Sequence, residues 1–225
     1  MDLKLIAKNS ILLYVRMLIA LCVGFFTTRI VLQALGETDY GIFNVVSGTV
    51  ALIGFINTIL ITSTYRFISY EMGKGNFTKI SHVFSTSLFI HICLSVIVFI
   101  LGESIGVYYI NNILNVPFER LSVAMIVFQV SLITACVNII SIPFQGLLTA
   151  YENFSYIALL KILTSVLNLF VALSLSLFSN VLIYYAILMC VSRIIISILY
   201  VVYCLLKYKQ VKIKFRSDRE LFKEI

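Results

Sequence analysis

Residues 180–206 read NVLIYYAILMCVSRIIISILYVVYCLL, an apolar run that contains a single charged residue, Arg193. A helix that crosses a bilayer needs about 20 largely apolar residues, and this run supplies them without a break. A strand of an outer-membrane barrel would instead be a short segment in which apolar and polar residues alternate. The stretch therefore predicts one transmembrane α-helix.

Similar runs occupy most of the remaining chain. Of its 225 residues, 61% are hydrophobic and 12% are charged, whereas a soluble domain is about half apolar and about a quarter charged. We predict an all-α, polytopic membrane protein in which residues 1–206 form a bundle of six transmembrane helices and residues 207–225 form a basic tail. The other five expected helices cover 9–33, 41–64, 83–103, 121–149 and 154–177.

Positive charge is distributed unevenly between the predicted loops. Of the 17 Lys and Arg residues, the two termini and the loops on their side of the membrane hold all but five. The loops on the other side hold only Arg120. Because loops rich in Lys and Arg stay in the cytoplasm, we expect both termini to be cytoplasmic. The basic tail is predicted to contact anionic membrane lipids rather than nucleic acid, since it lacks interleaved aromatic residues.

The remaining four cations fall inside predicted helices, and the ten acids lie at helix ends, in loops or in the tail. A charge at the centre of a membrane helix costs about 2.5–3.5 kcal/mol, so a partner or water must offset it. Arg193 lies at mid-helix, and Arg16 and Lys161 lie about 7 Å from the midplane. We expect these three to face an aqueous cavity that takes an anion, although Lys161 is long enough to reach the interface instead. Arg29, near a helix end, is predicted to pair with Glu37 or Asp39.

One face of the second predicted helix, 41–64, is unusually polar. Asn44, Gly48, Thr58 and Thr62 fall on this face at helical spacing, interrupted by Phe55. Small and polar residues allow helices to approach closely in a membrane, which is one interpretation. The other interpretation is that the face forms a wall of the same aqueous cavity.

No pattern typical of catalysis is present. His82 and His91 have no acid or cysteine at ligand spacing, and the five cysteines are scattered through apolar runs. A glycine-rich phosphate-binding loop is also lacking. We therefore expect no enzymatic activity, no metal site and no cofactor.

Three segments resemble one family of membrane proteins. The first reads RIVL at 29–32 and LGETDYGIFNV at 35–45, and two weaker matches cover 65–76 and 143–152. Together they resemble the bacterial polysaccharide-export flippases of the multidrug/oligosaccharidyl-lipid/polysaccharide exporter superfamily. The resemblance implies translocation of an undecaprenyl-pyrophosphate-linked oligosaccharide across the inner membrane, for surface polysaccharide such as lipopolysaccharide. It further implies a cationic cavity, and from their depth in the membrane we expect Arg16 and Arg193 to be the charge partners of the pyrophosphate.

Members of that family contain two six-helix bundles, roughly twice the helices expected here. The chain therefore corresponds to the N-terminal half, which would pair with a second six-helix half or with another copy of itself. Two alternative functions stay open. A cation-coupled multidrug exporter of the same superfamily usually needs a carboxylate inside the membrane, and the predicted helices hold none at depth. A membrane-bound glycan enzyme would need a cluster of acids, histidines or nucleophiles at a membrane face.

Overall fold

The computed structural model of the protein describes the backbone of residues 3–51 and 54–208. The side chains at 3–13, 15, 16, 19, 51, 54–56 and 77 lie outside the description. The described chain is helical and contains no strand. Its elements are α1 (Leu3–Ala51), α2 (Gly54–Gly73), α3 (Phe77–Leu101), the π-helical turn η1 (Gly102–Gly106), α4 (Val107–Asn112), the 3₁₀ turn η2 (Phe118–Arg120), α5 (Leu121–Ala150), α6 (Phe154–Ser174), the 3₁₀ turn η3 (Leu175–Leu177) and α7 (Val181–Lys207).

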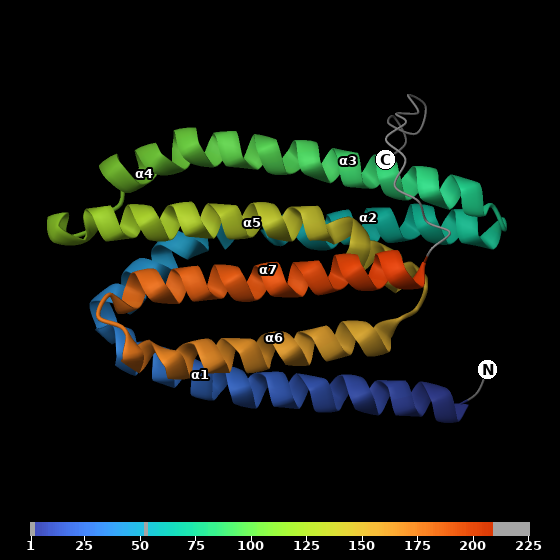
Figure 1. Ribbon diagram of the computed structural model, residues 1–225, viewed down its shortest axis with the longest axis horizontal. Helices are drawn as coiled ribbons and strands as arrows, with labels where there is room; N and C mark the ends of the chain where they lie inside the picture. The colour runs from blue at the N-terminus through green and yellow to red at the C-terminus, as the bar shows by residue number, and fades with distance from the viewer. Residues whose placement is uncertain (1–2, 52–53, 209–225) are drawn as a thin grey trace.

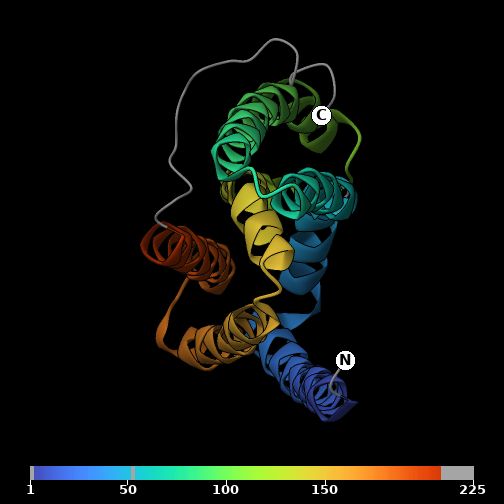
Figure 2. The same cartoon turned by 90° about the vertical axis from the view of Figure 1, so that its right-hand side faces the viewer.

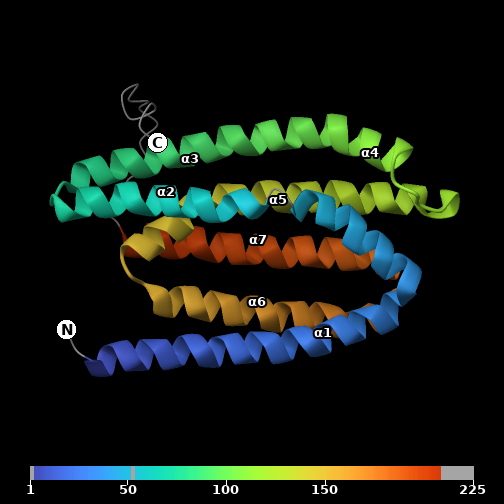
Figure 3. The same cartoon turned by 180° about the vertical axis from the view of Figure 1, so that it is seen from behind.

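These helices run side by side along the long axis of the molecule (Figures 1 and 3). The N-terminus, the α2–α3 turn, the α5–α6 turn and the end of α7 lie at one end, which we call the N-terminal end. The bend in α1, the α4–α5 connection and the α6–α7 connection lie at the opposite end. Within the described residues the chain thus runs the length of the bundle six times, and five of its helical regions are long and apolar enough to cross a membrane. The prediction of an all-α, six-helix membrane bundle is confirmed.

A glycine produces the sharp bend in α1. Gly36 has φ 74° and ψ 171°, a backbone conformation that is essentially restricted to glycine, whereas its neighbours on both sides are helical. The bend separates the first crossing from the second, which consists of the remainder of α1 followed by α2. Sequence analysis ended the first helix at residue 33 and began the second at residue 41, whereas the structure reverses the chain at one residue, Gly36.

We expect Gly36→Ala to destabilise the fold by about 1–3 kcal/mol, because a Cβ at this positive φ strains the backbone. Gly41→Ala is the matched control, since Gly41 is helical and a Cβ there would meet nothing within 4 Å. The midpoint of thermal unfolding in detergent should fall for the first variant alone. Equal midpoints for the two variants would contradict the role of Gly36.

The break between the second and third crossings is shorter than expected. Sequence analysis ended the second helix at residue 64, whereas α2 continues to Gly73 and α3 begins at Phe77. Gly75 adopts a left-handed conformation with φ 69°, which allows the chain to reverse within a few residues. The Asn76 side chain then accepts a hydrogen bond from the Lys79 backbone N–H at 3.2 Å and caps α3. A compact turn therefore replaces the predicted loop.

Helix α5 is the centre of the bundle, and it packs against α7, α2, α3 and α1. In the end-on view it lies between α2 and α3 on one side and α1 and α6 on the other (Figure 2). Two apolar clusters surround it. The cluster toward the opposite end includes Val46, Val127 and Ala186, and the cluster toward the N-terminal end includes Phe84 and Leu147. Polar residues interrupt the apolar packing midway between these clusters.

Candidate functional site

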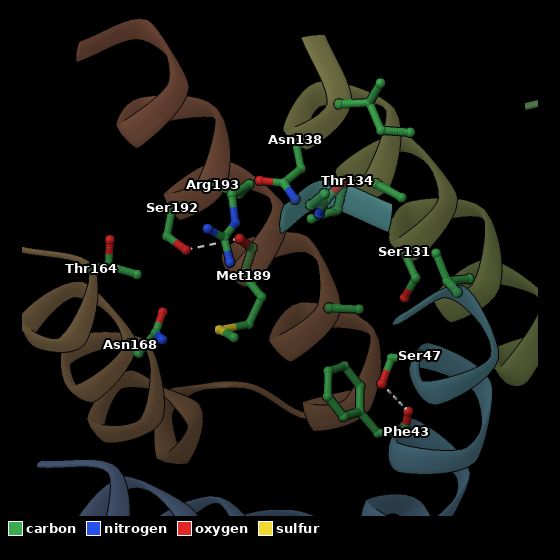
Figure 4. A pocket seen from close by; sticks show the side chains of 15 residues that line it. Phe43, Ser47, Ser131, Thr134, Asn138, Thr164, Asn168, Met189, Ser192 and Arg193 are labelled. Atoms are coloured by element: carbon green, nitrogen blue, oxygen red, sulfur yellow. Dashed lines mark hydrogen bonds between the residues drawn. The ribbon is translucent and has the colours of Figure 1, made fainter. Parts of the chain in front are cut away.

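A cavity of about 290 Å³ lies midway along the bundle, where α1, α5, α6 and α7 face one another (Figure 4). Apolar side chains such as Phe43 and Met189 share its wall with polar ones. The side chains of Asn138 and Arg193 come from different helices, and both point into the cavity. The full lining is Phe43, Ser47, Val50, Asn57, Ser131, Thr134, Ala135, Asn138, Ile139, Thr164, Asn168, Ala186, Met189, Ser192 and Arg193.

A smaller and more polar pocket of about 30 Å³ continues this cavity toward the N-terminal end. Asn138, Thr164 and Arg193 line both spaces, so the two adjoin each other, and we call them together the central cavity. The additional residues in its narrow part are Ser141, Gln145, Lys161, Ile196, Ser197 and Tyr200. The central cavity thus widens from a polar, cationic part toward a partly apolar part.

Several hydroxyl groups of the lining are bonded to their own helices. Thr134 donates to the Val130 carbonyl at 2.8 Å, and Ser192 donates to the Met189 carbonyl at 2.8 Å. Thr164 does the same with Leu160 at 2.7 Å. A polar group in a membrane interior is costly unless it is hydrogen-bonded, and these bonds meet that demand without a ligand. The hydroxyl oxygens stay available to accept from water or substrate.

Unlike these hydroxyl groups, two amides of the lining have no hydrogen-bond partner, and its guanidinium has no ion-pair partner, among the described residues. Within the described chain, the side-chain amides of Asn138 and Asn168 form no hydrogen bond, and Arg193 forms no ion pair. Arg193 is half-buried and supplies five N–H donors in a fixed plane. These groups leave the cavity with unused donors on Arg193 and the amides, and with unused acceptor oxygens on the amides, including the buried Asn57 Oδ1. Donors that converge in a partly dry site are suited to an anion such as a phosphate.

The structure brings together two of the three predicted cationic residues. Arg193 on α7 and Lys161 on α6 both line the narrow part of the central cavity, although the Lys161 side chain remains exposed. Among the residues that line the two spaces there is no Asp or Glu. Arg16 belongs to α1, and its side chain lies outside the described residues. A cavity that holds two cations and no acid has a positive potential.

The polar face predicted for 41–64 lies beside the cavity rather than in its lining. Asn44, Thr58 and Thr62 are exposed, and a Cβ on Gly48 would meet nothing within 4 Å. On this crossing the cavity is instead lined by Phe43, Ser47, Val50 and Asn57. The role of Asn44, Gly48, Thr58 and Thr62 as a wall of the aqueous cavity stays a prediction.

The prediction for Arg29 is wrong. Asp39 pairs with Arg120, with 3.4 Å between the Arg120 Nε and an Asp39 carboxylate oxygen. Arg29 is exposed and forms no ion pair within the described chain. The bend at Gly36 carries Asp39 to the start of α5, away from the first crossing. This contact ties the second crossing to η2 at the opposite end of the bundle.

Sequence analysis missed most of the lining on α5 and α6. The signal was present, because Ser131, Thr134, Asn138, Ser141 and Gln145 are separated by steps of three and four residues, which place them on one helical face. On α6 the same spacing joins Lys161, Thr164 and Asn168. Polar residues at helical spacing in an apolar run would have identified two of the walls.

Comparison with known proteins agrees with this architecture. The model of the MatE family matches residues 13–174. None of the curated proteins compared with the chain matches it significantly. An outward-facing structure of a multidrug resistance MATE family transporter of the MOP superfamily is similar over 96% of this chain and 50% of its own, with a TM-score of 0.76 and 20% identity.

Two further solved structures have the same fold. A MOP superfamily transporter from Pyrococcus furiosus, described by the reverse polarity of its binding pocket, is 19% identical over 96% of this chain and 50% of its own, with a TM-score of 0.69. A MATE structure in complex with Br-NRF is 19% identical over 93% of this chain and 49% of its own, with a TM-score of 0.65. The chain thus spans about half the length of the solved structures that it matches.

Proposed function

Because the chain belongs to the MatE family of membrane transporters, we propose that it forms one half of a flippase for an undecaprenyl-pyrophosphate-linked oligosaccharide. The family and the structural neighbours are multi-pass transporters rather than enzymes, and the chain is about half of such a transporter. The observation that carries the proposal is the charge of the central cavity. Arg193 and Lys161 line it, and no acid does.

The size of the central cavity indicates which part of the substrate enters. About 290 Å³ is at the lower limit of ligand pockets and is too small for an oligosaccharide. It is large enough for a diphosphate, whose oxygens accept charge-assisted hydrogen bonds from guanidinium and ammonium groups. The sugars would then lie outside this bundle, toward a second six-helix half, where the exposed face of Asn44, Thr58 and Thr62 supplies polar groups.

The proposed orientation determines which part of the cavity the substrate meets first, on its way from the cytoplasm to the other side of the membrane. Six cations of the described chain lie at the N-terminal end, outside the cavity, whereas Arg29 and Arg120 lie toward the opposite end. The six are Lys4, Lys8, Arg66, Lys74, Lys79 and Lys207. By the positive-inside rule, the N-terminal end faces the cytoplasm of a bacterial inner membrane. The narrow cationic part of the cavity is nearer to that end and would meet the pyrophosphate first. The basic tail would contact anionic lipids there.

A cation-coupled multidrug exporter is the second candidate. It is favoured by the partly apolar wall of the wider part, where Phe43 and Met189 are typical of a site for a drug-sized molecule. It is disfavoured by charge, because most such drugs are cations and Arg193 would repel them. The nearest acid on the third crossing, Glu103, lies in η1 and accepts a hydrogen bond from Gln129 at 3.1 Å, so its carboxylate is already engaged outside the cavity.

Two assays on one preparation separate these functions. The full-length protein is reconstituted in vesicles with a fluorescent polyprenyl-pyrophosphate-linked oligosaccharide, and the fraction that an external glycosidase can reach is followed over time. Efflux of a fluorescent organic cation is measured in parallel, under a proton or sodium gradient. We expect movement of the lipid-linked sugar and no gradient-driven efflux. Efflux of the cation without movement of the sugar would overturn the proposal in favour of drug export.

A further inference from the structure

A second hollow lies between α5 and α7 and is almost entirely apolar. This groove has a volume of about 220 Å³ and is lined by Val137, Ile140, Ile194, Ile198 and Val201, together with Ser141 and Ser197. Three of its residues come from α5 and four from α7, so it follows the line along which these two helices pack. Ile198 is 53% exposed at its rim. In a bilayer the groove would open toward hydrocarbon.

The groove and the central cavity share a wall. Ser141 and Ser197 line both the groove and the narrow cationic part of the cavity, so a layer one side chain thick separates hydrocarbon from Arg193 and Lys161. Both serines are almost fully buried, with 3% and 9% of their surface exposed. Because serine side chains are small, α5 and α7 need to move apart only a little at this contact to open a passage between the groove and the cavity. We call this contact the α5–α7 seam.

Next to the seam, helix α5 lacks one of its backbone hydrogen bonds. Pro143, two residues beyond Ser141, has no backbone N–H to donate to the carbonyl of Ile139, and a proline at such a position allows a helix to bend. The hydroxyl of Ser141 donates to the Asn138 carbonyl at 2.7 Å and accepts from the Gln145 amide at 3.1 Å. The hydrogen bonds of Ser141 thus stay within α5 rather than crossing to α7, so none of them needs to break when the seam opens.

We propose that the α5–α7 seam holds an anionic isoprenoid lipid, with its hydrocarbon chain in the groove and its phosphate at Arg193 and Lys161. This inference rests on the proposed function and names the place of the lipid part of the substrate. The groove, with a volume of about 220 Å³, suits one hydrocarbon chain, whereas an anionic phospholipid brings two chains and a glycerol to its phosphate. A neutral lipid has no group for the cations, and a free phosphate has no chain for the groove.

The two parts of the seam contribute differently to binding. A chain that moves from bilayer hydrocarbon into an apolar groove changes its surroundings little, because lipid tails are as apolar as the groove. The attraction between phosphate and the two cations acts in a region of low dielectric constant and supplies the affinity. The groove therefore selects and guides the chain, and a chain without a phosphate should show no preference for it.

The chain contains no tryptophan, so a single introduced tryptophan reports on its own surroundings. Ile198→Trp places the reporter at the rim of the groove, and Phe89→Trp is the matched control on α3, where the side chain is 42% exposed and outside the groove. The full chain is reconstituted in vesicles of unlabelled phosphatidylcholine. Quenching is then measured as brominated polyprenyl phosphate, brominated polyprenol, brominated phosphatidylcholine or brominated phosphatidylglycerol is added, each in its own series.

Brominated polyprenyl phosphate should quench the Ile198→Trp reporter at a lower mole fraction than the Phe89→Trp reporter, while phosphatidylglycerol and the two lipids without net charge quench both alike. Selective quenching by phosphatidylglycerol as well would overturn the choice of an isoprenoid lipid. Adding Arg193→Gln and Lys161→Gln should raise the half-saturating mole fraction at least a hundredfold, because loss of Arg193 alone is expected to cost more than tenfold in affinity. Equal quenching at the two positions, or selective quenching that survives loss of both cations, would overturn the proposal that the lipid binds at the seam. Selective quenching without translocation of the lipid-linked sugar would overturn the proposed function and leave the seam intact.

Discussion

Replacement of Arg193 by Gln is expected to slow translocation of a lipid-linked oligosaccharide by about two orders of magnitude, without loss of fold. The guanidinium lines both parts of the central cavity, so any anion that enters from either part meets it. Removing one partner of a desolvated, hydrogen-bonded charge pair costs about 2–5 kcal/mol, which corresponds to at least a tenfold loss of affinity. Initial rates in the vesicle assay measure this loss directly.

The thermal stability of Arg193→Gln should not fall with its translocation rate. Arg193 has no carboxylate partner within the described chain, so in the empty transporter its charge is offset only by dipoles and water. Removing an unpaired charge from a membrane interior lowers the cost of folding there. The midpoint of thermal unfolding of Arg193→Gln should therefore equal or exceed that of the unchanged protein. A fall in both rate and midpoint would show that Arg193 is structural.

Neighbouring substitutions make the test specific. Lys161→Gln should slow translocation less, about tenfold, because the exposed ammonium is better screened by water. Arg193→Lys should restore part of the rate, since it keeps the charge but loses the planar donors. Arg66→Gln is the control, because Arg66 is an exposed cation on α2 outside the cavity. If Arg66→Gln slowed translocation as much as Arg193→Gln, net charge rather than the cavity would be responsible.

Local signals predicted the number and type of the helices well. Apolar runs long enough to span a bilayer are a property of adjacent residues, and the break at Gly36 is encoded by one residue that tolerates its conformation. Helix ends were less accurate where side chains decide them. Asn76 caps α3 and Gly75 reverses the chain, so the α2–α3 turn is far shorter than the polar composition of 66–81 indicates.

Contacts between distant residues account for what sequence analysis missed. Asp39 meets Arg120 because the bend at Gly36 and the start of α5 lie at the same end of the bundle, which no local rule specifies. Lys161 and Arg193 were recognised as unusual one by one, but their shared pocket depends on how α6 packs against α7. The polar face of α5 that lines the cavity could have been predicted without such contacts, because its residues recur at helical spacing in the sequence.

A substitution at Gly106 should give the largest loss of stability among the glycines of the third crossing. Gly102 and Gly106 are four residues apart and form a small-residue pair that lets η1 approach α5. A Cβ on Gly102 would lie 2.5 Å from Leu132 Cδ1, and a Cβ on Gly106 would overlap the ring of Phe128. Both neighbours are buried, with 1% and 3% of their surface exposed, so neither has space into which to move.

Gly106→Ala has two opposing effects on the free energy of unfolding, and the larger of them decides whether the variant is more or less stable. Alanine is a better helix former than glycine by about 1 kcal/mol, which favours the variant. Overpacking a buried contact typically costs about 1–3 kcal/mol, and the overlap with Phe128 falls at the severe end. We expect a net loss of about 2 kcal/mol. Gly48→Ala is the control with the opposite expected sign, because a Cβ there would meet nothing within 4 Å.

A second substitution identifies the contact responsible. Phe128→Ala alone should destabilise the bundle by about 3–5 kcal/mol, because it removes a buried aromatic ring. Combined with Gly106→Ala it should cost less than the two separate losses together, since the added methyl group then occupies space that the ring has vacated. Unfolding free energies of the four proteins in detergent complete the cycle. Strict additivity would mean that Gly106 contributes through backbone freedom rather than through close packing of η1 on α5.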